Sequence, residues 1–364
     1  MTRTGPRAAA PAPADDPADL TVEWMQAALV SAGFDVVLTG VEVEPVGTGQ
    51  MSVSLRVRCQ AAAPTVDAPE SVIVKIPSPD RAVRQLVCAG YRAEIAFYEE
   101  LAPTVAVQVP ACYLAVANAD ASSFTLLLED LAPAAQGDQV AGASLEAVTA
   151  AARNLAGLHG PRWCDPALRR AAWPQPGGSG AHRFTAELVS GALPQLAERL
   201  GPALSAEDLT TLERSAAVLA GFLGARAERF APIHGDYRLD NLLFGPGAAV
   251  SAVDWQTLDL GLPTRDLAYL AGTSLSIGDR RAGETDLVGA YWRQLVRHGV
   301  DAYTRDECFD DYRLGMLHCP LSIVLGAAYG TRTERGDTMF ATMVERSCAA
   351  MRDLGTLALA EALP

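Results

Sequence analysis

The sequence contains almost no lysine. Among its 29 lysine and arginine residues only Lys75 is a lysine, which leaves 28 arginines. Arginine offers a planar fork of donors, whereas lysine offers a compact point charge on a thin stem. Position 75 therefore needs something that arginine does not supply, unless its lysine is an accident of composition.

Positive charge is scarce as a whole, and the formal net charge is −14. No basic stripe is present that could displace counterions from nucleic-acid phosphates, so we expect no nucleic-acid partner. The acidic balance is compatible with a cationic substrate, but solubility is the simpler explanation and is preferred. No uninterrupted apolar run approaches the ~20 residues of a membrane span, so we expect no membrane partner either.

The chain also lacks paired cysteines. Its seven cysteines are far apart and form no Cys-x-x-Cys pair, which argues against a disulfide framework and a zinc site. We expect the protein to be located in a reducing cytoplasm. The first residues lack the leucine-rich core of a secretory signal, and their Ala, Pro and Asp content predicts a disordered tail over 1–18.

Alternating apolar and polar residues predict strands in the first third of the chain. Val41–Glu44 and Met51–Arg58 alternate on either side of a Gly-x-Gly turn, which is typical of a β-hairpin. An amphipathic helix is predicted before this hairpin, at 20–32. After the hairpin we predict a strand at 71–76, a helix at 81–101, and strands at 112–117 and 124–129.

Helical patterns dominate after an Ala-, Pro- and Gly-rich loop at 132–143. We predict helices at 144–159, 182–200, 206–230 and 284–298, and two more near the C-terminus, with Asp19, Ser144 and Ser205 as N-caps. Only 233–254 interrupts them, as a loop with two short strands. The sequence thus predicts an α+β protein with two lobes: 19–131, a small antiparallel sheet with one main helix, and 132–364, which is mostly helical.

The densest chemical signal is I-H-G-D-Y-R-L-D-N-L-L-F at 233–244, followed by V-D-W-Q at 253–256. Asp236 and Asn241 lie five residues apart in a predicted loop, and Asp254 follows the next turn. Oxygen ligands on adjacent loops suit a hard cation such as Mg²⁺. Phosphoryl transfer requires such a metal site together with a further carboxylate that can accept a proton.

This pattern, with Gly235 where protein kinases have arginine, resembles the aminoglycoside phosphotransferase and choline kinase superfamily, nearest its ecdysteroid-kinase-like and related bacterial branches. The resemblance covers about 40–275. It implies a protein-kinase-like fold in which Asp236 is the catalytic base and Asn241 with Asp254 binds Mg²⁺. The nucleotide would be ATP, with GTP as the alternative. Asp240 and Asp266 are better explained as residues that hold the loops.

The same resemblance assigns a nucleotide site to the first lobe. Lys75 would contact phosphates and pair with Glu94, for which Glu99 is the rival. The backbone of Glu129 and Leu131 would contact adenine. The turn between the first two strands would approach the phosphates closely, because its glycines permit it; its residues are Gly47, Gly49, Gln50, Met51 and Ser52.

We therefore predict a small-molecule kinase that phosphorylates an alcohol and needs no obligate protein partner. A protein kinase is disfavoured because D-F-G and A-P-E are absent. A pseudokinase or nucleotide-binding scaffold is the remaining alternative, although the intact base, metal ligands and lysine argue against it. The sequence leaves the acceptor open among aminoglycoside, macrolide, steroid-like and amino-alcohol classes.

Overall fold

The computed structural model describes residues 9–47, 51–63, 67–170 and 178–363. The chain divides into two compact units. The first unit comprises 1–103 and 109–132, and the second comprises 104–108 and 133–364. The predicted lobe boundary at 131 differs from this division mainly in the short segment 104–108, which belongs to the second unit.

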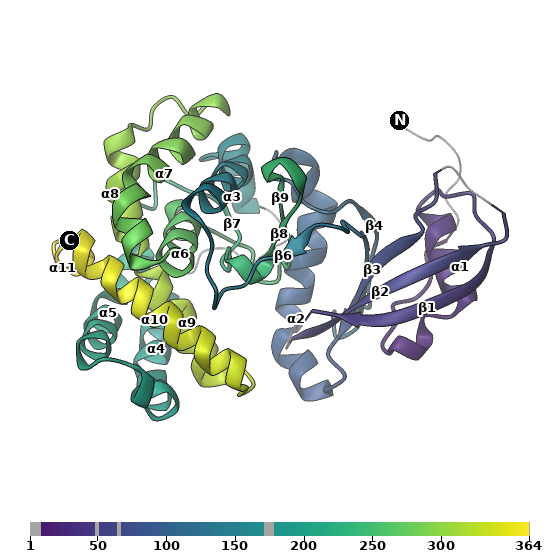
Figure 1. Ribbon diagram of the computed structural model, residues 1–364, viewed down its shortest axis with the longest axis horizontal. Helices are drawn as coiled ribbons and strands as arrows, with labels where there is room; N and C mark the ends of the chain where they lie inside the picture. The colour runs from purple at the N-terminus through teal and green to yellow at the C-terminus, as the bar shows by residue number, and fades with distance from the viewer. Residues whose placement is uncertain (1–8, 48–50, 64–66, 171–177, 364) are drawn as a thin grey trace. The chain divides into compact units, whose positions relative to one another are not determined.

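The first unit is built on one antiparallel sheet (Figure 1). Its strands lie in the order β1-β2-β3-β5-β4, so that β3 is the central strand. Lys75 on β3 pairs with Ser54 on β2 and with Leu126 on β5. The strands are β1 (Leu38–Val46), β2 (Ser52–Ala61), β3 (Ser71–Pro77), β4 (Cys112–Ala117) and β5 (Phe124–Glu129).

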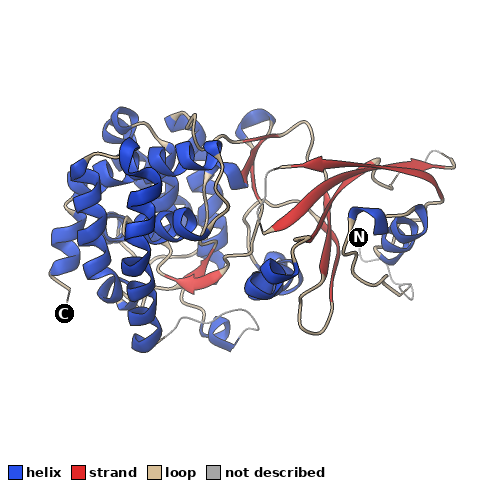
Figure 2. Ribbon diagram, turned by 90° about the horizontal axis from the view of Figure 1, so that it is seen from below, coloured by secondary structure: helices blue, strands red, loops and turns tan. Residues whose placement is uncertain are grey.

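This sheet, drawn in red in Figure 2, has two different faces because side chains alternate along each strand. Val72, Val74 and Ile76 of β3 point into an apolar core shared with Met25 and Leu29 of α1 (Val22–Ser31). Because successive side chains of a strand point to opposite faces, Lys75 lies on the other face. That face is the one met by α2 (Arg81–Ala96), which continues as a π-helical turn over Phe97–Leu101.

The predicted disordered tail is wrong for residues 9–18; residues 1–8 lie outside the described part. Ala14 is buried, and its backbone N–H donates to Thr125 Oγ1 at 2.8 Å. Trp24 Nε1 donates to the Ala12 carbonyl at 2.9 Å. Small alanine side chains enter the core without any periodic pattern, so composition alone gave no sign of this packing. The predicted cap at Asp19 is also wrong, because Thr21 caps α1.

The second unit is mostly helical, with two small sheets (Figure 1). The helices are α3 (Leu145–His159), α4 (Ser179–Leu200), α5 (Ala206–Gly224), α6 (Thr264–Ser274), α7 (Ile277–Arg297), α8 (Arg305–Gly315), α9 (His318–Tyr329), α10 (Glu334–Leu354) and α11 (Thr356–Glu361). One sheet joins β6 (Ala135–Gln136), β8 (Leu242–Phe244) and β9 (Val250–Ala252), and the other joins β7 (Ala231–Ile233) and β10 (Asp259–Gly261).

The predicted α+β class is confirmed, and so are the caps at Ser144 and Ser205. Helix α6 was not predicted from the sequence. Nearly every residue of this helix is buried, so it lacks the polar face that makes a helix visible in a sequence. No helix in the described part of the chain is long and apolar enough to cross a membrane.

Candidate active site

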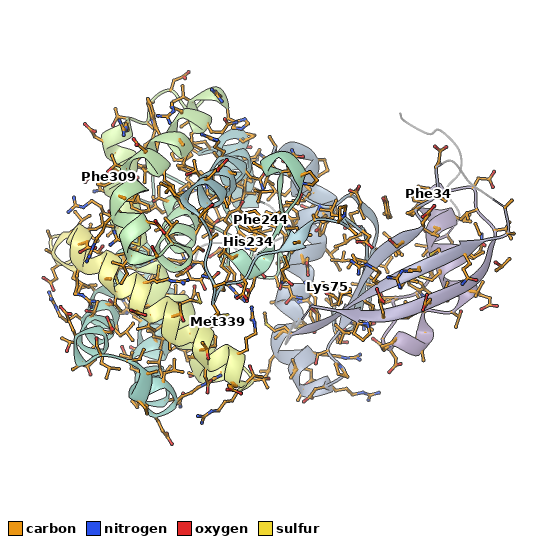
Figure 3. All side chains as sticks on the ribbon, viewed as in Figure 1. Phe34, Lys75, His234, Phe244, Phe309 and Met339 are labelled. Atoms are coloured by element: carbon orange, nitrogen blue, oxygen red, sulfur yellow. The ribbon has the colours of Figure 1, made fainter. Side chains whose placement is uncertain are left out.

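Lys75 and Glu94 form a buried ion pair in the first unit. Lys75 Nζ lies 2.9 and 2.7 Å from the two carboxylate oxygens of Glu94. The side chains are only 6% and 1% exposed. Strand β3 and helix α2 thus bring together two residues that are 19 positions apart. Removing one partner of such a pair would leave an uncompensated charge in the interior, so the two residues depend on each other. Figure 3 labels Lys75 on its strand.

The described residues of the predicted phosphate-contacting turn are Gly47, Met51 and Ser52, and Ser52 begins β2. Gly47 has φ +75°, a conformation that disfavours other residues, and a Cβ there would meet nothing within 4 Å. Gly49 and Gln50 lie outside the described residues. Ser52 is buried and Met51 is partly exposed. The Met51 carbonyl accepts a hydrogen bond from Tyr91.

Tyr91 is a structural residue that the sequence reading missed. Its hydroxyl accepts from the Ser78 backbone N–H at 3.1 Å and donates to Met51, while its ring stacks on Phe124 at 4.2 Å between centroids. Tyr91 lies on α2 one helical turn before Glu94. The same helix therefore holds both the lysine partner and the end of the glycine turn.

Glu129 and Leu131 lie at the end of β5. The Glu129 backbone N–H donates to the Ala111 carbonyl at 2.8 Å, and its carboxylate accepts from the Ala111 N–H at 3.1 Å. Between them, Asp130 accepts from Arg56 Nε at 2.7 Å and from Ser71 Oγ at 2.7 Å. Burial opposes the shift, but these bonds lower the pKa of Asp130. The Asp130 carboxylate therefore fixes this segment to β2 and β3.

In the second unit, the loop that carries Asp236 begins with a glycine for a steric reason. Gly235 has φ +80°, and a Cβ there would lie 2.4 Å from the Thr257 carbonyl oxygen. Thr257 Oγ1 also donates to the His234 carbonyl at 2.7 Å. The close approach of these two loops explains why position 235 cannot carry the arginine found in the protein-kinase pattern.

Asp266 of α6 anchors the backbone of this loop through hydrogen bonds. Its carboxylate accepts from the backbone N–H groups of His234 at 2.6 Å and Gly235 at 2.9 Å. It also lies 3.3 Å from His159 Nε2. Burial would raise the pKa of Asp266, but the bond from His159 and the surrounding histidines lower it overall. The expectation that Asp266 holds a loop agrees with these contacts.

His318 of α9 supports the same loop and was not singled out by its sequence. Its Nε2 lies 2.8 Å from the Gly235 carbonyl oxygen, and its Nδ1 lies 3.2 Å from Nη2 of the half-buried Arg265. Since Arg265 can only donate, Nδ1 accepts and Nε2 carries the proton given to Gly235. Burial, assisted by Arg265, lowers the pKa of His318 to about 4.

Asp236 and Asn241 are in direct contact. Asn241 Nδ2 donates to the Asp236 carbonyl oxygen at 2.9 Å and to Asp236 Oδ2 at 2.8 Å. Both amide protons are thereby directed at Asp236, which leaves the side-chain carbonyl oxygen of Asn241 to face another group. Arg238 also pairs with Asp236, at 3.0 Å. The sequence reading did not assign this arginine a role.

Asp254 is held next to these residues by its neighbour Val253. The Val253 N–H donates to the Asn241 carbonyl at 3.0 Å, and its carbonyl lies 3.0 Å from His234 Nε2. Asp254 itself has φ +67°, which is strained for a residue with a Cβ. Such strain persists where the surrounding structure imposes it, and it often accompanies a functional site.

These oxygens are suitable ligands for Mg²⁺, which binds one or two protein oxygens and completes its octahedron with water and phosphate. Within the described residues no three His, Cys, Asp or Glu side chains gather as a metal site. A magnesium site built on Asn241 and Asp254 would contain only one residue of these four types, namely Asp254, and would complete its coordination with water and phosphate. Asp240 is engaged elsewhere, because its carboxylate accepts from Arg238, Arg335 and the Gln139 N–H.

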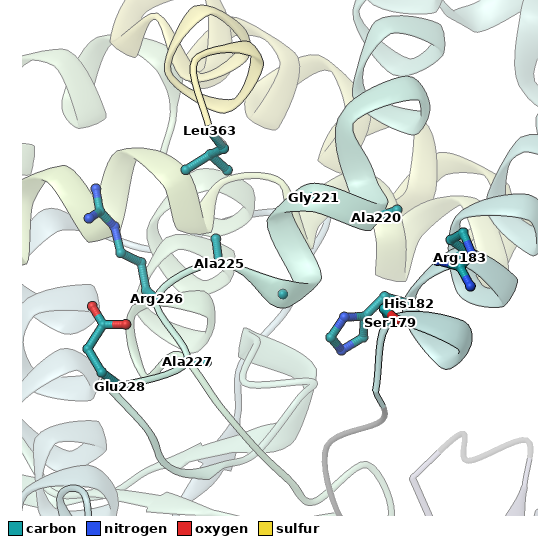
Figure 4. A pocket seen from close by; sticks show the side chains of 11 residues that line it. Ser179, His182, Arg183, Ala220, Gly221, Ala225, Arg226, Ala227, Glu228 and Leu363 are labelled. Carbon is teal, nitrogen blue, oxygen red and sulfur yellow. The ribbon is translucent and has the colours of Figure 1, made fainter.

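A separate cavity of about 600 Å³ lies at the ends of α4 and α5 (Figure 4). Its polar lining includes His182, Arg183, Arg226 and Glu228. None of the site residues predicted from the sequence lines it. This cavity is therefore distinct from Asp236, Asn241 and Asp254, the second-unit residues expected to perform chemistry.

A model of the family described as "Phosphotransferase enzyme family" matches residues 63–306, more than half of the chain. The chain belongs to this family. Its members are small-molecule kinases that phosphorylate hydroxyl groups, and the resemblance predicted from the sequence is confirmed. A search of the curated proteins finds no match.

Solved structures support the fold. A choline kinase from Cryptosporidium parvum is 12% identical with a TM-score of 0.54, over 89% of this chain and 93% of that one. A microcompartment-associated aminopropanol kinase is 18% identical with a TM-score of 0.52, over 92% and 98%. A type I macrolide 2'-phosphotransferase is 12% identical with a TM-score of 0.50, over 89% and 98%. At these identities the likeness establishes a kinase-like phosphotransferase fold and not an acceptor.

Proposed function

We propose that this phosphotransferase uses ATP, with GTP as the alternative donor, to phosphorylate a hydroxyl group of a small molecule. Asp236 is the base. The observation that carries this assignment is the contact between Asp236 and Asn241, which fixes a carboxylate beside an amide whose oxygen is left for a metal. A positioned carboxylate of this kind can orient an alcohol and accept its proton.

Asn241 and Asp254 would hold Mg²⁺ through the Asn241 side-chain oxygen and the Asp254 carboxylate. Bound there, the ion would neutralise phosphate charge and orient the phosphates for in-line transfer. The protein contributes rigidity, because Val253 links the Asn241 backbone to the His234 ring immediately before Asp254. A preorganised pair of ligands spends little free energy on reorganisation when the reaction occurs.

In the first unit, Lys75 would contact the nucleotide phosphates while Glu94 keeps its ammonium in place. The turn at Gly47, Gly49, Gln50, Met51 and Ser52 would add backbone N–H donors to the phosphates. The Glu129 carbonyl and the Leu131 N–H would contact adenine. Tyr91 and Asp130 support these assignments because they fix the turn and the end of β5 to the sheet.

We infer that the partner is a small-molecule alcohol, with no nucleic acid, membrane or obligate protein partner. The relatives named above act on choline, aminopropanol and macrolides, so the acceptor class stays open among amino alcohols, aminoglycosides, macrolides and steroid-like alcohols. We assign the enzyme to the cytoplasm, where ATP is available and where its seven free cysteines would stay reduced.

The test is a phosphorylation screen. Purified protein is incubated with Mg²⁺ and γ-labelled ATP or GTP against a panel of alcohols from these four classes, and labelled product is measured. We expect transfer to members of one class. Tight binding of Mg·ATP without transfer to any alcohol would instead favour a nucleotide-binding scaffold.

A further inference from the structure

Helix α6 carries a tyrosine, Tyr269, that contacts the proposed base. This residue is only 2% exposed, and its ring meets the His318 ring edge-on, with 5.4 Å between the centroids. Its hydroxyl forms a side-chain hydrogen bond with the Asp236 carboxylate and lies close to Arg238. A buried phenol therefore adjoins the carboxylate that is proposed to accept a proton.

The spacing of residues along α6 explains how this contact arises. Residues three positions apart share one face of a helix, so Tyr269 lies on the same side as Asp266. The Asp266 carboxylate accepts from the backbone N–H groups of His234 and Gly235. One turn later on this face, Tyr269 reaches the side chain of the next loop residue, Asp236. The helix thus holds both the backbone and the carboxylate of this loop.

The phenol is held in place by its surroundings. Helix α6 is buried along nearly its whole length, and the His318 ring packs against that of Tyr269. His318 is fixed in turn, because its Nε2 donates to the Gly235 carbonyl at 2.8 Å. Burial, reinforced by the charge of Asp236, raises the pKa of Tyr269 well above its ordinary value. The hydroxyl therefore keeps its proton and donates a hydrogen bond to the carboxylate.

We propose that Tyr269 is a positioning residue for phosphoryl transfer, whose hydroxyl holds the Asp236 carboxylate in the orientation that receives the acceptor's proton. This inference rests on the proposed function of Asp236 as the base. Asn241 Nδ2 and Arg238 Nε bind the same carboxylate, at 2.8 and 3.0 Å. Those two donors belong to the loop itself, so Tyr269 is the partner that ties the carboxylate to a separate, buried helix.

A hydroxyl differs from the other two donors in one respect. The Asn241 amide nitrogen and the Arg238 guanidinium can only donate, whereas a phenol oxygen can also accept. As the acceptor oxygen bonds to the γ-phosphorus and the bond from phosphorus to the β,γ-bridging oxygen breaks, the acceptor's proton passes to Asp236. The protonated carboxyl then has an O–H of its own, and Tyr269 can accept from it after rotating its hydroxyl. Tyr269 therefore fits both protonation states of the base and keeps its own proton throughout.

The test compares the wild-type enzyme with Tyr269→Phe, which removes the hydroxyl and keeps the ring against His318. Steady-state kinetics on the best acceptor from the screen give kcat and KM, and calorimetry gives the affinity for Mg·ADP. We expect kcat to fall by about tenfold, which is part of the roughly 10²–10⁴-fold that a positioned acid or base contributes. KM for both substrates and the Mg·ADP affinity should change by less than about twofold, because the hydroxyl acts on the base and on neither substrate.

Tyr312→Phe is the matched control. Tyr312 is also fully buried in the second unit, and its hydroxyl donates to the Glu284 carboxylate at 3.2 Å. This variant loses the same kind of bond, from a phenol to a carboxylate, but the carboxylate has no proposed part in the reaction. Both variants should lower the melting temperature, whereas Tyr312→Phe should keep the wild-type kcat. An equal loss of kcat in the two variants would overturn the proposal.

Combining Tyr269→Phe with Asp236→Asn separates positioning of the base from general support of the loop. If the hydroxyl acts through the carboxylate, Tyr269→Phe should change the residual rate of Asp236→Asn by less than about twofold. The proposal is overturned if the loss in that background is again about tenfold, or if Tyr269→Phe alone keeps the wild-type kcat. The assignment of Asp236 fails separately, if Asp236→Asn transfers phosphate at the wild-type rate.

Discussion

At the scale of single residues, Lys75 shows how one ammonium is fitted to its site. Its Nζ donates hydrogen bonds to both carboxylate oxygens of Glu94, and the pair is almost completely buried. A guanidinium is wider and planar, and it would have to displace α2 or expose one of its nitrogens. This geometry gives a physical reason for the only lysine in the chain.

We expect Lys75→Arg to fold but to lose most of its phosphotransferase activity, about 100-fold in kcat/KM for the nucleotide, because the charge moves away from the phosphates. The measurement is steady-state kinetics with circular dichroism on the same sample. Arg58→Lys, an exposed exchange on β2, serves as the control and should keep wild-type activity. Near-normal turnover of Lys75→Arg would refute the phosphate role.

Gly235 provides a second prediction at this scale. Gly235→Ala should lower the free energy of unfolding by at least about 2 kcal/mol, because the new methyl group meets the Thr257 carbonyl and φ is positive. Gly191→Ala in α4 is the control, since nothing lies within 4 Å of its Cβ position. That helix substitution should stabilise the protein by roughly 0.5–1 kcal/mol. Urea unfolding of both variants tests this, and equal effects would contradict it.

At the scale of secondary-structure elements, α6 and α9 act as supports for the loop of Asp236. Asp266 binds two backbone N–H groups of this loop, and His318 binds the Gly235 carbonyl. Donors and acceptors of the loop backbone are thus satisfied from two helices that carry no reacting group themselves. This arrangement gives Asp236, the proposed base, a fixed backbone position.

The support from α9 predicts a dependence of stability on pH. His318 stays neutral in the folded protein down to its pKa of about 4, whereas an unfolded histidine gains a proton near its ordinary pKa of 6.5. The unfolded state therefore binds more protons between these values, and stability falls as the pH is lowered through this window. The expected loss from this residue is about 2 kcal/mol between pH 7.5 and 5.

Urea unfolding at the two pH values measures this loss in the wild type and in His318→Gln. The glutamine keeps a donor for the Gly235 carbonyl but does not titrate. The variant should therefore lose less stability on acidification than the wild type does. An identical decrease in the two proteins would show that His318 does not carry the effect.

The strands and catalytic motif were predictable because their signals are local. β4 and β5 were predicted with their observed bounds, and both are short runs of mostly apolar residues. The contacts of Asp236 with Asn241 follow from a spacing of five residues in one loop. Arg238 was within the same motif, but no spacing rule indicates which carboxylate an arginine will bind.

What could not be predicted depends on tertiary packing. The helix α6 is buried on nearly all sides, so its residues carry no amphipathic pattern. Ala14 enters the core through a backbone bond to Thr125, which no local pattern encodes. His318 lies 83 residues beyond Gly235, and their contact exists only once the helices of the second unit have packed.

At the scale of the whole molecule, the chain comprises a sheet-based unit with Lys75 and a helical unit with Asp236, the proposed base. If Mg²⁺ is bound through Asn241 and Asp254, the metal should couple nucleotide binding to the stability of the whole chain. Ligands that bind only the native state stabilise it in proportion to the logarithm of their concentration.

We therefore expect ATP with Mg²⁺ to raise the melting temperature of the wild type more than ATP with EDTA does. In Asp254→Asn the two conditions should give nearly the same shift, because the charged metal ligand is gone. Differential scanning fluorimetry measures this difference. A full Mg²⁺-dependent shift in Asp254→Asn would contradict the metal assignment.

The central claim is that Asp236 accepts the proton of an alcohol during phosphoryl transfer. The most direct measurement is the rate of labelled product formation by Asp236→Asn on the best acceptor from the screen, alongside its affinity for Mg·ATP. The account predicts that kcat falls by at least about 100-fold while Mg·ATP still binds. Turnover at the wild-type rate in this variant would contradict it.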